Sequence, residues 1–214
     1  MKVDEFFSKF VEGYLFGDLD AMSSCTSDPR TGFGAVCYPM VATTCAGMEL
    51  LGGLLAPREK RFNAHCGREY FLRYWNDYFG AVFPDYMVLG VLVYPLARHG
   101  IAHGYVAKHG VMVSKSVGNA LRVDREKKEI EIDANAFYRD FKSSYEERVV
   151  PILAKEGDDG GINQVSVQLQ LEAMDEVFGA QAREPFASLP ELPLGVIRSA
   201  PQLGASGAMG PVPR

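Results

Sequence analysis

The sequence lacks the signatures of the commonest enzyme classes. It contains no G-x4-G-K-[ST] phosphate-binding loop, no G-x-G-x-x-G dinucleotide fingerprint and no G-x-S-x-G nucleophile elbow. The H-E-x-x-H pattern of zinc metalloproteases is also missing, because Gly-Ile-Ala separates His99 from His103. These absences exclude the readable forms of P-loop, Rossmann-type and serine-hydrolase chemistry.

Cysteine and long apolar runs are also scarce. The four cysteines form no C-x2-C pair, so we expect reduced and mostly buried thiols and no zinc site. They are Cys25, Cys37, Cys45 and Cys66. The longest clean apolar run, Tyr86 to Ala97, has 12 residues, whereas a membrane span needs about 20. With no signal-peptide pattern after Met1, we expect a soluble, cytoplasmic protein with no membrane partner.

The size and charge of the chain predict one main domain. Its 214 residues are 47% hydrophobic and carry a formal net charge of -5. This is enough for one core and an appendage, and the acidic balance argues against a protein that coats nucleic acid. Six of the 12 prolines follow Arg183. We therefore predict a single helical domain over residues 1–182 and a flexible Pro/Gly-rich tail over 183–214.

Apolar residues at three- and four-residue steps predict a mainly helical fold. The first helix should begin near Val3 and end at Gly17-Asp18, and Pro39 should mark the first turn of the second helix or a kink in it. The second helix is apolar on nearly all sides and should be central. Aromatic side chains along the third helix are interpreted as core and not as a base-stacking surface. The expected helices cover residues 3–15, 39–55, 68–79, 86–106 and 134–153.

A different pattern follows the fourth of these helices. Alternating apolar residues over 110–133, joined by a charged link, predict a small β-hairpin with room for a third strand. Residues 162–180 fit either a strand or a helix, and we favour a helix because Gln, Leu, Glu, Ala and Met dominate there. The expected architecture is an up-and-down helical bundle with a hairpin inserted after the helix at 86–106.

A cationic cluster ends the most apolar of the expected helices. Arg98, His99 and His103 follow the apolar run within 86–106, and buried polar groups cost free energy unless they are paired or used. On a helix, His99 and His103 share a face, whereas Arg98 and His103 lie roughly 140° apart. The Arg98 and His103 side chains would converge most easily beside a second copy of the helix.

The spacing Arg98-x4-His103, with a polar residue directly after the arginine, resembles the R-x4-6-H motif of HEPN domains. These domains are small helical bundles and are often dimeric. Many are metal-independent ribonucleases, and others bind nucleotides or are inactive partners in toxin and defence systems. The resemblance covers about residues 1–155. It implies an HEPN-like bundle that forms a homodimer, places two motifs face to face, binds RNA or a nucleotide and uses no cofactor or metal.

Residue chemistry suggests how such a site would work. His103 is suited to act as a general base or acid, because its pKa normally lies near neutrality. Arg98 can hold phosphate oxygens with two parallel hydrogen bonds. His99 is the third candidate catalytic residue and would hold the arginine or contact the scissile phosphate. Tyr105 and Lys108 are supporting candidates. By the resemblance, RNA cleavage would give a 2′,3′-cyclic phosphate and a 5′-hydroxyl.

Glu49 is an exception in the apolar second helix and is the expected partner of Arg98. If this pair forms, Glu49 would orient the guanidinium of Arg98 without being a catalyst. If the pair does not form, the Glu49 side chain would reach the surface between small residues.

Three alternatives remain open at the level of sequence. The Arg/His cluster could be structural, in a non-catalytic binding or regulatory partner, or His99 and His103 could bind zinc at their four-residue spacing. The basic loop at 57–66 could meet a phosphate backbone, but a solvated connection is the favoured interpretation. Its basic side chains are Arg58, Lys60, Arg61 and His65.

Overall fold

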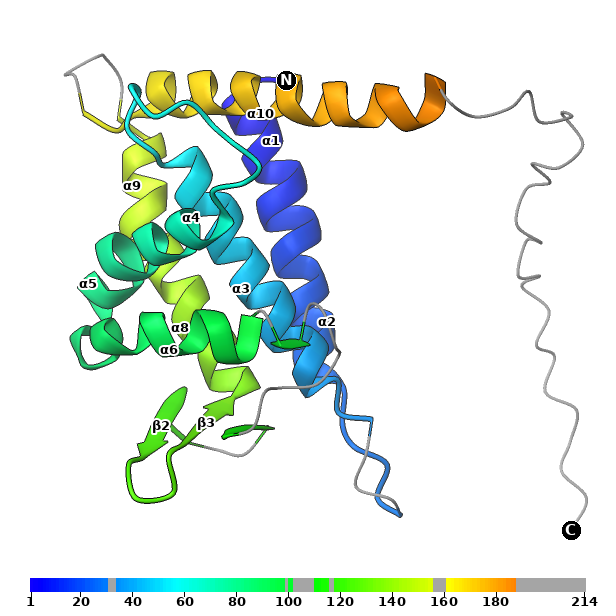
Figure 1. Ribbon diagram of the computed structural model, residues 1–214, viewed down its shortest axis with the longest axis vertical. Coiled ribbons are helices and arrows are strands. Elements are labelled where there is room, and N and C mark those ends of the chain that lie inside the picture. The colour runs from blue at the N-terminus through cyan, green and yellow to red at the C-terminus, as the bar shows by residue number, and fades with distance from the viewer. Residues whose placement is uncertain (31–33, 99, 102–109, 116–117, 156–160, 188–214) are drawn as a thin grey trace, which may run out of the picture. The chain divides into compact units, whose positions relative to one another are not determined.

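The computed structural model describes residues 1–30, 34–98, 100–101, 110–115, 118–155 and 161–187. These residues form a mainly helical fold with a small mixed sheet (Figure 1), which confirms the expected fold class at this level. Residues 1–177 form one compact unit and residues 178–214 a second. None of the helices in the described ranges is long and apolar enough to cross a membrane.

The first helix is longer than the sequence suggested. It runs on through Gly17, so the prediction that Gly17-Asp18 ends it is wrong. A glycine inside a helix costs only about 1 kcal/mol relative to alanine. Here the added turns bury Leu19 completely and place Asp20 where it accepts a hydrogen bond of 2.6 Å from the Tyr138 hydroxyl. The consecutive segments are α1 (Val3–Phe6), the π-helical η1 (Phe7–Phe16) and α2 (Gly17–Ser24).

Helix α3 (Cys37–Leu54) is the central helix, as predicted, and Pro39 lies in its first turn. Ten of its side chains or glycines are buried. It packs most extensively on α4 (Gly67–Tyr74). The two backbones touch at Gly52, because a Cβ at this position would overlap the Tyr70 carbonyl oxygen.

The aromatic stripe of the third helix belongs to the core, as predicted. Helix α4 continues through η2 (Trp75–Phe79) and α5 (Gly80–Val82). The side chains of Phe71, Tyr74, Trp75, Tyr78 and Phe79 are all buried. They are therefore not available to stack on bases.

The helix that carries the motif is built from three short segments. They are η3 (Pro84–Leu89), α6 (Gly90–Val93) and the π-helical η4 (Tyr94–Arg98). Pro95 lies inside η4, so the turn that presents Arg98 is wider than an α-helical turn. Residues 100–101 are helical, and 99 and 102–109 lie outside the described residues.

The expected hairpin is present, together with a third strand. Strands β2 (Leu121–Asp124) and β3 (Glu129–Asp133) pair antiparallel, and β1 (Val111–Ser114) pairs parallel with β3. The order is therefore β1-β3-β2. Helix α8 (Ala134–Ser144) follows β3 directly, and the Asp133 carboxylate caps it by accepting a 2.8 Å hydrogen bond from the Ala136 amide.

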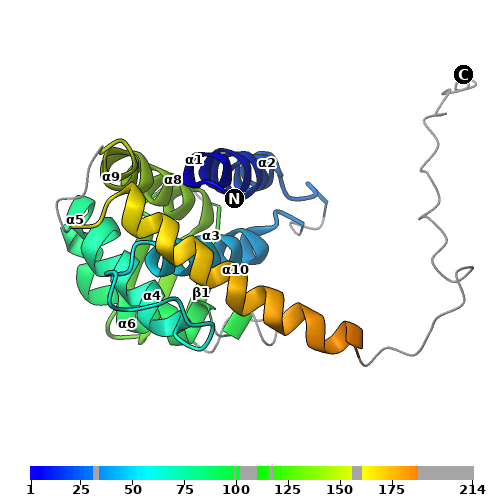
Figure 2. The ribbon, with the colours of Figure 1, turned by 90° about the horizontal axis from the view of Figure 1, so that it is seen from above.

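The last two helices complete the packing. Helix α8 continues through η5 (Tyr145–Val149) into α9 (Val150–Leu153), as the prediction of a helix over 134–153 requires. The ambiguous region after residue 162 is helix α10 (Gln164–Ala187), which confirms the favoured interpretation. Its first part crosses the ends of α1 and α3 (Figures 1 and 2), where Gln168 accepts a hydrogen bond from the Val3 amide and Gln170 donates to the Lys60 carbonyl.

The tail predicted from residue 183 begins within α10. Its remainder, residues 188–214, lies outside the described residues.

The close approach at Gly52 gives a direct test of the α3–α4 contact. Gly52→Ala should lower the free energy of unfolding by about 2–3 kcal/mol, because the new methyl group meets backbone that cannot move without separating the helices. Gly17→Ala is the matched control. It has open space around its Cα and helical backbone angles, so it should stabilise the protein by about 0.5–1 kcal/mol. Urea unfolding measures the change in the free energy of unfolding for both variants. Equal changes in the two variants would contradict the close contact at Gly52.

Candidate functional site

Arg98 and Glu49 form the ion pair expected from the sequence. Arg98 Nε donates a hydrogen bond of 3.0 Å to Glu49 Oε2, joining η4 to the middle of α3. Both side chains are 23% exposed, so the pair lies at the edge of the core and not inside it. Within the described ranges, the two Nη groups of Arg98 have no hydrogen-bond partner. The guanidinium is thus fixed on one edge and open on the other.

A third element, α4, also touches this pair. The Glu49 carboxylate lies against Gly67, where a Cβ would overlap Oε1. Glycine is therefore required at the start of α4 for Glu49 to keep its position. The next residue, Arg68, is exposed and has no ion-pair partner among the described residues.

The charged groups of this site also act on two neighbouring side chains, Tyr94 and Cys45. Burial raises the pKa of the Tyr94 phenol, and the Glu49 carboxylate raises it further. The Arg98 and Arg68 guanidinium groups act in the opposite direction on the same phenol. Burial also raises the pKa of the Cys45 thiol to about 12, which keeps the thiol protonated and unreactive at neutral pH. The charges of this site are therefore carried by Glu49 and the two arginines.

An apolar groove of about 400 Å³ begins beside Arg98. Its floor is the surface of α3 and one wall is Leu15 of η1. Among the described residues that line the groove, Arg98 is the one with a charged side chain. The groove is lined by Leu15, Ala42, Thr43, Ala46, Gly47, Leu50 and Arg98.

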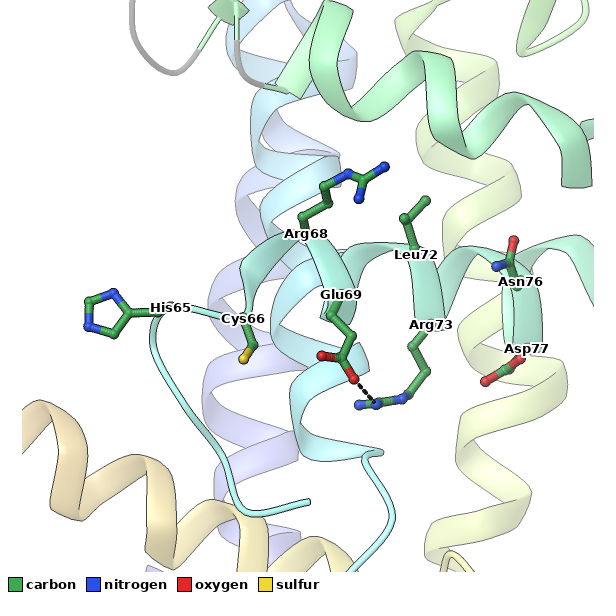
Figure 3. A pocket seen from close by; sticks show the side chains of 8 residues that line it. All are labelled: His65, Cys66, Arg68, Glu69, Leu72, Arg73, Asn76 and Asp77. Carbon is green, nitrogen blue, oxygen red and sulfur yellow. Dashed lines mark hydrogen bonds and ion pairs between the residues drawn. The ribbon is translucent and has the colours of Figure 1, made fainter. Parts of the chain in front are cut away.

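A larger but less suitable pocket, of about 580 Å³, lies along α4 (Figure 3). It mixes cations and acids: Arg73 is paired with Glu69 at 3.0 Å, and Asp77 adds a second carboxylate. Figure 3 shows Arg68 leaving the helix on a different side from that ion pair. This balance of charge makes the pocket a weaker anion site than the open edge of Arg98.

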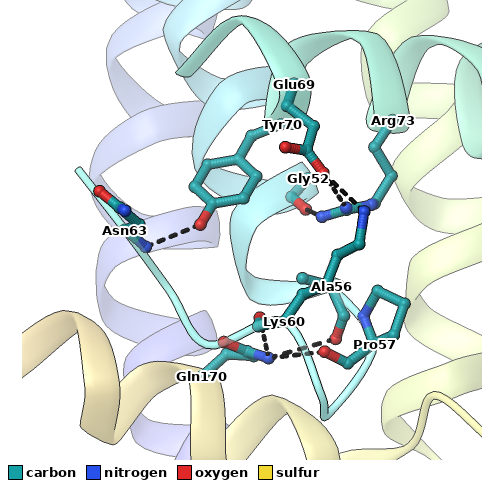
Figure 4. A network of polar contacts seen from close by, with 9 residues as sticks. All are labelled: Gly52, Ala56, Pro57, Lys60, Asn63, Glu69, Tyr70, Arg73 and Gln170. Carbon is teal, nitrogen blue, oxygen red and sulfur yellow. Dashed lines mark hydrogen bonds and ion pairs between the residues drawn. The ribbon is translucent and has the colours of Figure 1, made fainter. Parts of the chain in front are cut away.

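The basic loop at 57–66 is largely occupied by contacts within the protein. Lys60 pairs with Glu69 at 2.9 Å, and Arg61 pairs with Glu176. Figure 4 shows Lys60 and Arg73 converging on Glu69, while the loop carbonyls accept hydrogen bonds from Gln170. The favoured interpretation from the sequence was a solvated connection. The Lys60 and Arg61 side chains are indeed exposed, to 58% and 69%, but their ion pairs leave little free charge for a phosphate backbone.

The other four site residues predicted from the sequence are two histidines, a tyrosine and a lysine of the motif segment. His99, His103, Tyr105 and Lys108 lie outside the described residues, so the structure tests neither their catalytic roles nor the zinc alternative. Among the residues that are described, no group of three or more His, Cys, Asp or Glu side chains is arranged to hold a metal ion.

Sequence reasoning missed Gly67, Arg68 and the groove. The groove had a signal in the sequence, because small residues recur at four-residue spacing at Ala42 and Ala46. Gly67 had no signal in the sequence, because its role is to leave room for the Glu49 carboxylate, which is distant in the chain.

Comparison of the chain with protein-family models, with curated proteins and with solved structures found no match. The site must therefore be interpreted from its own geometry.

The Arg98–Glu49 pair should contribute measurably to stability. A double-mutant cycle with Glu49→Gln and Arg98→Met should give a coupling energy of about 1 kcal/mol, since both groups are mostly shielded from solvent. The cross-strand pair Arg122–Glu131, 3.2 Å apart, is the control; its arginine side chain is 76% exposed, so the pair should couple by roughly 0.5 kcal/mol or less. Urea unfolding of the wild type, the single variants and the double variant gives the coupling energy of each pair. A coupling no larger than that of the control would show that the pair does not hold Arg98.

Proposed function

We propose that this protein is an HEPN-like homodimer that binds RNA or a nucleotide at a composite site, with Arg98 as the phosphate-binding residue. The observation that carries the proposal is the state of its guanidinium: Nε is held by Glu49, and the Nη edge is open beside a groove. An arginine fixed in this way is preorganised, so it loses less conformational entropy when it binds a phosphate. Glu49 is a positioning residue in this scheme.

In the hydrolytic form of the proposal, the protein is a metal-independent endoribonuclease. His103 removes the proton of the 2′-hydroxyl, or donates a proton to the leaving 5′-oxygen, while Arg98 stabilises the negative charge on the phosphorane. In this scheme the role of His99 is to hold the arginine or to contact the scissile phosphate, and the roles of Tyr105 and Lys108 are supporting ones. Two motifs related by a twofold axis supply the second acid or base that one protomer lacks.

The helix that carries Arg98 also has an apolar face suited to dimerisation. Met87, Val88, Val91 and Leu92 follow helical spacing and are all exposed, Val88 to 76% and Val91 to 55%. Exposed apolar residues grouped on one helix face commonly mark a protein–protein contact. Arg98 lies at the end of the same helix, beyond the wider π-helical turn η4, so packing through this face would bring the two motif helices together.

The second candidate is a non-catalytic binding or regulatory partner. It is favoured by the same ion pair, because a guanidinium held by Glu49 can also simply satisfy a carboxylate in an apolar helix. Binding without cleavage is the result that would select it.

Binding of a single-stranded RNA tests the role of Arg98. Arg98→Ala should weaken binding roughly 10- to 100-fold, the loss expected for a charge-assisted contact to phosphate. Arg122→Ala removes an equally charged but remote side chain and should leave the affinity close to that of the wild type. Fluorescence anisotropy of a labelled RNA measures both. Unchanged binding by Arg98→Ala would exclude the proposed site.

Cleavage is tested on the same RNA in the presence of a chelator. The hydrolytic form requires products ending in a 2′,3′-cyclic phosphate, and loss of cleavage but not of folding in His103→Ala. RNA that is bound but left intact by the wild-type protein would select the non-catalytic candidate.

The apolar face gives a separate test of the dimer. Val88→Glu places a charge at the most exposed position of that face, so it should convert a dimer into a monomer with little effect on the fold. Val123→Glu, at a position of β2 that is 38% exposed, is the control and should leave the mass unchanged. Sedimentation or light scattering measures the mass. A wild-type protein that is monomeric at all concentrations would contradict the dimer.

A further inference from the structure

The groove beside Arg98 has the form of a site for a flat ligand. Its floor lacks long side chains at Ala42 and Ala46, which are at least partly exposed, whereas Gly47 beside them is buried. Leu15 packs directly on the helix backbone: a Cβ at Gly47 would lie 2.9 Å from Leu15 Cδ2. With Leu50 also lining it, the result is an apolar slot on the surface of α3.

The polar groups of the groove are few and specifically placed. The Nη edge of Arg98 is open at one end. The Thr43 hydroxyl lines the groove and has no hydrogen-bond partner in the described part of the chain. A hydroxyl can donate or accept, so it suits the edge of any base. The complementary ligand is therefore a planar, partly apolar group with a polar edge and an attached anion.

We propose that this groove holds the nucleobase adjacent to the phosphate that Arg98 binds. The inference rests on the proposed function and adds to it a base subsite within one protomer. Charge complementarity fixes the phosphate at Arg98, and the apolar floor of α3 covers one face of the base. Because Thr43 is the one described lining side chain besides Arg98 that can form a hydrogen bond, the subsite should accept all four bases with only modest preference.

The test compares two probes that share a phosphate and differ in the base, adenosine 5′-monophosphate and ribose 5-phosphate. Calorimetry or NMR titration of the full chain should show the nucleotide binding roughly tenfold more tightly, as expected from burying one face of a base against apolar side chains. Ala46 is exposed on the groove floor, so Ala46→Leu fills the groove without disturbing the core. In this variant the advantage of the nucleotide over ribose 5-phosphate should disappear.

The matched control is Ala21→Leu, which adds the same group at an exposed position of α2 outside the groove and should keep the tenfold advantage. If Ala46→Leu also keeps it, or if its solution mass changes because the groove is an interface between copies, the base subsite is wrong while Arg98 still binds both probes. If neither probe binds the wild-type protein, or Arg98→Met binds both normally, the proposed function itself fails.

Discussion

A carboxylate in the middle of an apolar central helix has to be paired, and much of the site follows from that constraint. Leaving Glu49 unpaired at the edge of the core would cost free energy, and Arg98 removes that cost by donating from Nε. The pairing fixes the end of the motif helix against α3. It also determines which edge of the guanidinium remains available to a ligand.

Small residues of α3 allow this arrangement at two places. At Gly52 the helix touches the backbone of α4, which brings the start of α4 close enough for Gly67 to lie against Glu49. At Ala42 and Ala46 the lack of long side chains leaves the helix surface open as a groove. One helix thus forms both a close backbone contact in the core and an apolar groove near Arg98.

The elements were predictable where the periodic pattern was strong. The central helix, the aromatic core helix, the β2–β3 hairpin and the helical choice for α10 are all as the sequence indicated. The end of the first helix was not, because Gly17 is a weak stop signal and packing of Leu19 outweighs it. A partner for Glu49 was expected because an unpaired carboxylate in an apolar helix is costly, and Arg98 was the candidate that the structure confirms.

The sequence by itself determined the mainly helical class and the buried aromatic stripe, because each depends on local periodicity. It made Arg98 the expected partner of Glu49, and the structure decided between that pair and a surface position for Glu49. Only the tertiary structure decided that Gly67 lies against Glu49, that Leu15 and α3 border a groove beside Arg98, and that β1 pairs parallel with β3. These features join segments that are distant in the chain. Their contacts depend on how helices and strands approach one another in space, which residue spacing does not encode.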